Sequence, residues 1–151
     1  MDKELELLGY VGTLLRVMLV SELTSPEHQH VIRFNLSDFT ALGMLREQQV
    51  VRASELAGTL GIVPTTASSV IARLVKRGLV SRTQSETDRR AYDLSLTPEG
   101  AQLANAIHNQ DLHNMRLFLS ALDDEDQTTL LSLLGRVVER VASLENAEAS
   151  D

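Results

Sequence analysis

The chain of 151 residues contains no cysteine and no tryptophan, and aromatic residues make up only 3% of it. Without cysteine it has no disulfide, no thiolate metal ligand and no cysteine-based peroxide sensor. No apolar run approaches the roughly 20 residues that a membrane-spanning helix needs. The acidic start Met1–Glu6 also lacks the basic and then apolar order of a signal peptide. We therefore expect a cytoplasmic protein that makes no contact with a membrane.

The sequence also lacks the common enzyme motifs. It has no Gly-rich phosphate loop, no His-Glu-x-x-His and no Gly-x-Ser-x-Gly. The acidic cluster at 123–126 is explained by the start of a helix, where carboxylates are favoured. We therefore predict neither an enzyme nor a cofactor. The length and the 43% hydrophobic content are typical of one continuous compact domain.

The positive charge is confined to one segment. The chain has a net charge of -7, yet residues 50–100 hold seven basic and five acidic residues. The rest of the chain holds seven basic and sixteen acidic residues. A local excess of positive charge indicates a local site for an anionic partner, in spite of the acidic whole.

Two helices are predicted before this segment. Apolar residues at spacings of three and four mark one helix face within residues 4–22. Pro26 and its surroundings break the pattern over residues 24–34. Asn35, followed three positions later by Asp38, offers an N-cap and a first-turn acid for a helix that runs to about Gln48.

Residues 54–77 are predicted to form two short helices. Ser54–Leu60 ends at Gly61, which suits the left-handed residue after a helix, and Pro64 suits the first turn of the next helix. One face of the second helix is apolar and inward. It comprises Ala67, Val70, Ile71 and Leu74. Its outward polar face comprises Thr65, Thr66, Ser68, Ser69, Arg73 and Lys76.

A β-hairpin is predicted to follow. Gly78 ends the helix, Leu79–Thr83 forms one strand, and Tyr92–Leu96 alternates as a second. The polar run Gln84–Arg90 lies between the two strands, and its last residues are Asp88, Arg89 and Arg90. Two helices followed by such a hairpin are typical of a winged helix-turn-helix, which binds DNA.

Two long helices complete the chain. Thr97 as N-cap and Pro98 at the first position open a helix to about Leu122, whose inward side includes Met115. Asp123 begins the next helix, in which apolar residues repeat with the spacing 4-3-4-3. They are Leu130, Leu134, Val137, Val141 and Leu144. Such a seam is suited to packing against partner helices.

The combined motifs resemble the MarR family of bacterial transcriptional regulators. They are Glu55-Leu56-Ala57, Gly61, Arg73-Leu74, Gly78-Leu79-Val80, Asp88-x-Arg90, Leu94-x-Leu96-Thr97 and Gly100. The resemblance implies dimerisation helices at 1–34 and 101–146, and a winged helix-turn-helix lobe at 35–100. The chain departs from the family pattern at Val63, where a Ser cap is common, and at Ser69, where a basic residue is frequent.

The resemblance implies that the Pro64–Arg77 helix enters the major groove and that the hairpin reaches the minor groove. We expect DNA contacts in the helix from Thr65, Thr66, Ser68, Ser69, Arg73 and Lys76, and in the hairpin from Arg89 and Arg90. Asp88 is expected to orient a neighbouring arginine, since phosphates would repel a carboxylate. The expected function is a repressor that binds a pseudo-palindromic operator as a homodimer and responds to a small effector.

Two alternatives stay open. A helical protein-interaction module could use the same fold without binding DNA. A zinc-responsive regulator of the same family could draw ligands from its histidines, which are His28, His30, His108 and His113, with Glu22, Glu27 or Asp111. His108 and His113 are five apart, which is not the spacing that places two ligands on one helix face, so we predict no metal site.

Overall fold

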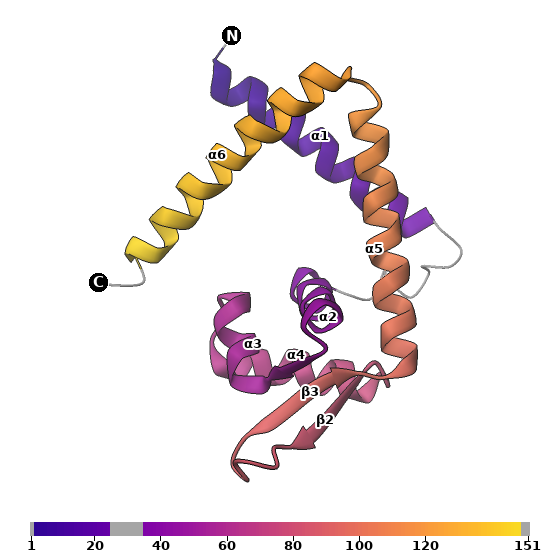
Figure 1. Cartoon of the computed structure of the whole chain (residues 1–151), viewed down its shortest axis with the longest axis vertical. Helices are drawn as coiled ribbons and strands as arrows, with labels where there is room; N and C mark the ends of the chain where they lie inside the picture. The colour runs from indigo at the N-terminus through magenta and orange to yellow at the C-terminus, as the bar shows by residue number, and fades with distance from the viewer. Residues whose placement is uncertain (1, 25–34, 149–151) are drawn as a thin grey trace. The chain divides into compact units, whose positions relative to one another are not determined.

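The computed structural model describes residues 2–24 and 35–148 (Figure 1). The chain divides into two compact units, Met1–Asp111 and Leu112–Asp151, with the division inside one helix. The elements are α1 (Lys3–Thr24), α2 (Leu36–Gln48), β1 (Val50–Arg52), α3 (Ala53–Leu60), α4 (Pro64–Lys76), β2 (Val80–Gln84), β3 (Tyr92–Leu96), α5 (Pro98–Leu119) and α6 (Asp124–Glu148). The predicted mainly helical fold with a small hairpin is therefore confirmed.

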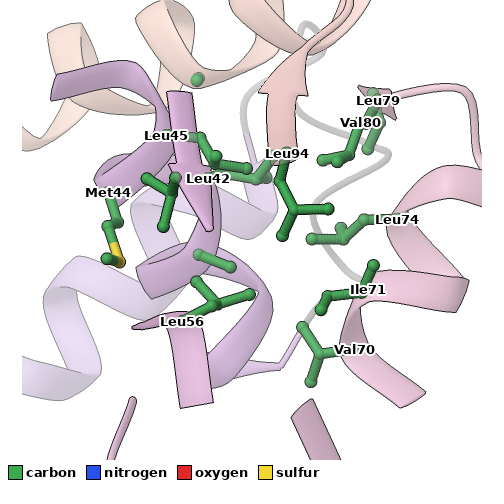
Figure 2. Packing of buried hydrophobic residues seen from close by; sticks show 13 residues of the cluster. Leu42, Met44, Leu45, Leu56, Val70, Ile71, Leu74, Leu79, Val80 and Leu94 are labelled. Carbon is green, nitrogen blue, oxygen red and sulfur yellow. The ribbon is translucent and has the colours of Figure 1, made fainter. Parts of the chain in front are cut away.

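The first unit is built around an apolar core between α2, α3, α4 and the sheet (Figure 2). Leu42, Leu56, Leu74 and Leu94 are each at most 1% exposed. The sheet is antiparallel in the order β1-β3-β2, and Leu94 of the central strand pairs with Val51 of β1. Burial of aliphatic side chains from all these elements stabilises the lobe that presents α4 and the hairpin.

The helix ends predicted from the sequence are confirmed. Asn35 and Asp38 form a reciprocal capping box at α2, with both hydrogen bonds at 3.0 Å. Gly61 follows α3 with φ +62°, the left-handed conformation that favours glycine. At α6, the Asp126 amide donates to Asp123 Oδ1 over 2.9 Å. These caps satisfy backbone groups that a helix leaves unpaired at its ends.

A close backbone contact holds the start of α5 against Leu79, in the turn between α4 and β2. The Gly100 amide donates to Thr97 Oγ1 over 3.0 Å, which confirms the predicted cap, and the Thr97 amide donates to the Leu79 carbonyl oxygen over 3.0 Å. A Cβ atom on Gly100 would lie 1.9 Å from that oxygen. Only glycine fits there, so this contact holds the start of α5 beside the turn that leads into β2.

One strand was not expected, and two expectations about the fold need correction. Strand β1 was not predicted, because three residues that pair with β3 more than 40 positions later give no local periodicity. The helix expected to reach Leu122 ends at Leu119. Met115, expected to be buried, is 37% exposed.

In the second unit, the predicted seam of α6 is exposed. Val137 is 58% exposed, Leu134 is 51% exposed, and the neighbouring Leu131 and Val138 are at least 60% exposed. In the first unit, α1 also presents exposed apolar side chains, with Leu5 at 65% and Leu8 at 67%. Contiguous exposed apolar surface is the kind of feature on which protein interfaces form.

Within residues 2–24 and 35–148, no single helix is long and apolar enough to cross a membrane. The pair α3 and α4 reaches the required length and composition only when taken together across a bend of 114°. The larger apolar residues Leu56, Val70, Ile71 and Leu74 of that pair lie in the core described above.

Candidate nucleic-acid interface

The outer face of α4 is formed by short polar side chains. Burial of Ala67, Val70, Ile71 and Leu74 turns the opposite side of this helix to the surface. The exposed residues predicted there are Thr65, Thr66, Ser68, Ser69 and Lys76. The Ser69 hydroxyl donates to the Thr65 carbonyl oxygen over 3.2 Å, so it is tied to its own helix. This face offers hydroxyl groups near the start of α4 and a cation near its end.

The N-terminus of α4 has no side-chain cap. Val63 occupies the N-cap position and is 61% exposed, with no side-chain capping hydrogen bond. Its carbonyl oxygen accepts from the amides of Thr66 (3.0 Å) and Ala67 (3.1 Å). Pro64 supplies the first helical residue without an amide hydrogen to satisfy. An apolar group therefore stands where the family pattern commonly has a hydroxyl.

The tip of the hairpin is a turn held by Asp88. The Arg90 amide donates to Asp88 Oδ1 over 3.0 Å, and the Ala91 amide donates to the Asp88 carbonyl oxygen over 3.0 Å. The Gln84 side-chain amide donates to the Arg89 carbonyl oxygen over 2.5 Å. Asp88 thus orders the backbone that carries both arginines, by the local bonding that makes Asp a turn residue.

The side chains at the tip of the hairpin are exposed. Arg89 and Arg90 form no ion pair with any residue of the described part of the chain, and the same is true of Lys76. Their charges are therefore available to an anionic partner.

The loop end of the hairpin is stabilised by contacts that the sequence did not predict. Arg52 of β1 donates to Ser85 Oγ over 3.1 Å and lies 3.5 Å from an Asp93 carboxylate oxygen. The Arg82 guanidinium stacks on the Tyr92 ring, 3.9 Å from its centroid. Arg52 could not be singled out from the sequence because its role depends on the pairing of β1 with β3.

Arg73 departs from the predicted outward set. Its guanidinium donates to Asp38 Oδ1 over 2.5 Å, and its side chain is only 35% exposed. The Asp38 side chain is 1% exposed. The expectation that Arg73 turns outward with its neighbours on α4 is therefore wrong, because the buried carboxylate of α2 draws the guanidinium inward.

The first unit also contains a cavity of about 550 Å³ beside α1, α2 and α5. Most of its lining is apolar and comprises Leu15, Met18, Leu36, Phe39, Leu42, Gly43, Ala104 and Ile107. Arg46, Glu47, His108 and Asp111 add polar groups. Burial raises the pKa of the Asp111 carboxyl, and the nearby His108 opposes that shift. An apolar cavity with a few polar groups is the usual form of a small-molecule site.

The metal alternative receives no support from the part of the chain that the structure describes. Over residues 2–24 and 35–148, no group of three or more histidine, aspartate or glutamate residues is arranged to hold a metal ion. His28, His30 and Glu27 lie outside the described residues.

Comparison with known sequences identifies relatives over most of the chain. The MarR family model matches residues 34–92, which include α2 to β2 and the start of β3. The HTH-type transcriptional regulator PecS of Dickeya dadantii is 31% identical over 139 residues, which cover 90% of this chain and 84% of PecS. The transcriptional repressor MprA of Escherichia coli is 28% identical over 71% of this chain and 62% of its own length.

Solved structures share the fold. FabT of Streptococcus pneumoniae, solved in complex with DNA, has a TM-score of 0.82 at 16% identity, covering 95% of this chain and 99% of that one. A structure of MarR has a TM-score of 0.72 at 19% identity over 97% of both chains. At these identities the likeness concerns the fold.

Proposed function

The chain belongs to the MarR family, whose curated relatives are named as transcriptional regulators and repressors, and from this we propose that it is a sequence-specific DNA-binding repressor. The observation that carries the proposal is the pairing of a hydroxyl-lined α4 surface with an ordered arginine turn on the hairpin. A helix of this kind reads base edges in the major groove, and arginine is favoured in narrow minor grooves.

Individual residues are proposed for separate contacts. Near the start of α4, Thr65, Thr66, Ser68 and Ser69 would meet base edges and phosphates. Short hydroxyl groups discriminate between bases less than Arg or Asn does, so part of the specificity must come from DNA shape. Lys76, Arg89 and Arg90 would meet the backbone and the minor groove, and these charges would supply most of the affinity.

Charge argues against the rival interaction module. Residues 73–90 hold six basic and two acidic residues in a chain whose net charge is -7. A protein-interaction module that no longer binds DNA would gain nothing from cations at the hairpin tip. The relatives named as transcriptional regulators favour the same conclusion.

We predict that Arg90→Ala weakens operator binding by about 1–3 kcal/mol and leaves the fold intact. Arg90 is exposed, and its amide, which holds the turn, is unaffected by the substitution. Binding is measured by mobility shift on the DNA upstream of the chain's own gene, and the fold is checked by the melting temperature. Arg116→Ala, which removes an equal charge from an exposed site on α5, serves as the control. Unchanged operator affinity at a normal melting temperature would refute the hairpin assignment.

We further propose that the chain acts as a homodimer. The apolar faces of α1 and α6 are exposed to water, and a second copy of the chain would bury them against matching faces. A dimer would also present two copies of α4 to a two-fold symmetric operator.

A small-molecule effector is proposed for the cavity of the first unit. Its lining includes Leu36 and Phe39, which flank Asp38 in the first turn of α2. A ligand changes DNA affinity only if it binds one arrangement of the protein more tightly than another. Because Asp38 bonds to α4 through Arg73, a ligand that shifts this turn would change the setting of α4. The measurable consequence is a change in operator affinity when the cavity is occupied.

A further inference from the structure

The Asp38 carboxylate is buried and serves two elements at once. Its Oδ2 accepts from the Asn35 amide over 3.0 Å, and its Oδ1 accepts from Arg73 over 2.5 Å. The first bond closes the capping box of α2, and the second reaches α4, 35 positions along the chain. A buried carboxylate is retained only where its charge and lone pairs are satisfied, and Arg73 supplies that cation.

The position of Arg73 suits a residue that fixes α4 to α2 better than a residue that contacts DNA. Its Nε is buried and has no hydrogen-bond partner among the described residues. On the buried side of α4, Arg73 lies near Val70 and Leu74 in the sequence, and both are at most 2% exposed. One edge of the guanidinium is therefore held against Asp38, and moving it out to a phosphate would leave the Asp38 charge buried and unpaired.

We propose that Asp38 and Arg73 form a positioning pair that sets α4 for operator binding, with Arg73 acting through Asp38 and not through a DNA contact. This inference rests on the proposed DNA-binding function. Packing of aliphatic side chains allows a helix to rotate or slide slightly, whereas a short, charge-assisted bond fixes it at one point. Discrimination among sequences depends on that setting, because base contacts require closer geometry than phosphate contacts.

The experiment compares Asp38→Asn and Arg73→Lys with Glu55→Gln, which removes one negative charge from an exposed site on α3. Each protein is titrated against the upstream DNA and against unrelated duplex of equal length, at several salt concentrations. Melting temperatures identify a temperature at which every variant is folded. Arg73→Lys keeps the positive charge but loses the planar fork that pairs with a carboxylate, so it stays informative if Asp38→Asn fails to fold.

The positioning role predicts that both variants lose about tenfold in operator affinity, equal to about 1.4 kcal/mol. Affinity for unrelated DNA should change less than about twofold, and the salt slope should stay as in the wild type, because the phosphate contacts remain. The sign for Asp38→Asn is diagnostic, since removal of a negative charge alone would strengthen binding to DNA. Glu55→Gln should bind at least as well as the wild type.

Other outcomes overturn the inference. If either Asp38→Asn or Arg73→Lys binds the operator as tightly as the wild type, the pair does not set the position of α4. Equal losses on both DNAs would show a general loss of structure. If the wild-type chain itself fails to prefer its upstream DNA, the proposed function fails first, and the positioning role falls with it.

Discussion

Val137→Asp is expected to convert the proposed dimer to a monomer. Val137 lies in the exposed apolar seam of α6, and in a dimer the new carboxylate would be buried without a partner. Such burial costs on the order of 3 kcal/mol or more for each of two copies, which would raise the dissociation constant by roughly four orders of magnitude. Val141→Asp should act alike. Sedimentation at micromolar concentration should show the chain mass of 16.6 kDa for the variant and twice that mass for the wild type.

Ser132→Asp is the matched control, because it adds the same charge to α6 outside the seam. It should remain dimeric. The monomer formed by Val137→Asp should also melt at a lower temperature, since its apolar faces on α1 and α6 lose their cover. A wild-type chain that sediments as a monomer would contradict the dimer proposal outright.

Operator affinity is expected to fall steeply with salt. The exposed Lys76, Arg89 and Arg90 would occur twice in a dimer, and the backbone of α4 would add further phosphate contacts. Six to ten contacts would release enough counterions to lower affinity by roughly 10³–10⁵ between about 50 and 200 mM salt. Fluorescence anisotropy of labelled upstream DNA measures this slope. Operator affinity that hardly changes with salt over that range would favour the alternative of a protein-interaction module.

Local chemistry made much of the fold predictable. The Asn35 N-cap with the first-turn acid Asp38, the left-handed Gly61 and the Thr97 cap each depend on residues within four positions, and each is confirmed. The structure adds that Asn35 and Asp38 bond reciprocally. The inward face of α4 was likewise evident, because four apolar residues repeat at helical spacing and all four are buried. Signals of this kind need no knowledge of the rest of the chain.

The features that escaped prediction depend on distant partners. β1 is stabilised by pairing with β3, and Arg52 gains its role only through that pairing. Arg73 has the spacing of an outward residue, yet Asp38, 35 positions earlier, draws it inward. Met115 has the periodicity of a buried residue and is 37% exposed in the single chain. Periodicity identifies an apolar face but not what covers it.

Footprinting on the upstream DNA tests the central proposal most directly. A dimer with two copies of α4 should protect a pseudo-palindrome of roughly 16–20 base pairs, with half-site centres about one helical turn apart. Flanking A/T-rich steps should be protected by the hairpin arginines, and Arg89 and Arg90 changed together to Ala should lose those flanks first. Protection of one isolated half-site by a single subunit, or no protection at protein concentrations that saturate unrelated DNA, would contradict the account.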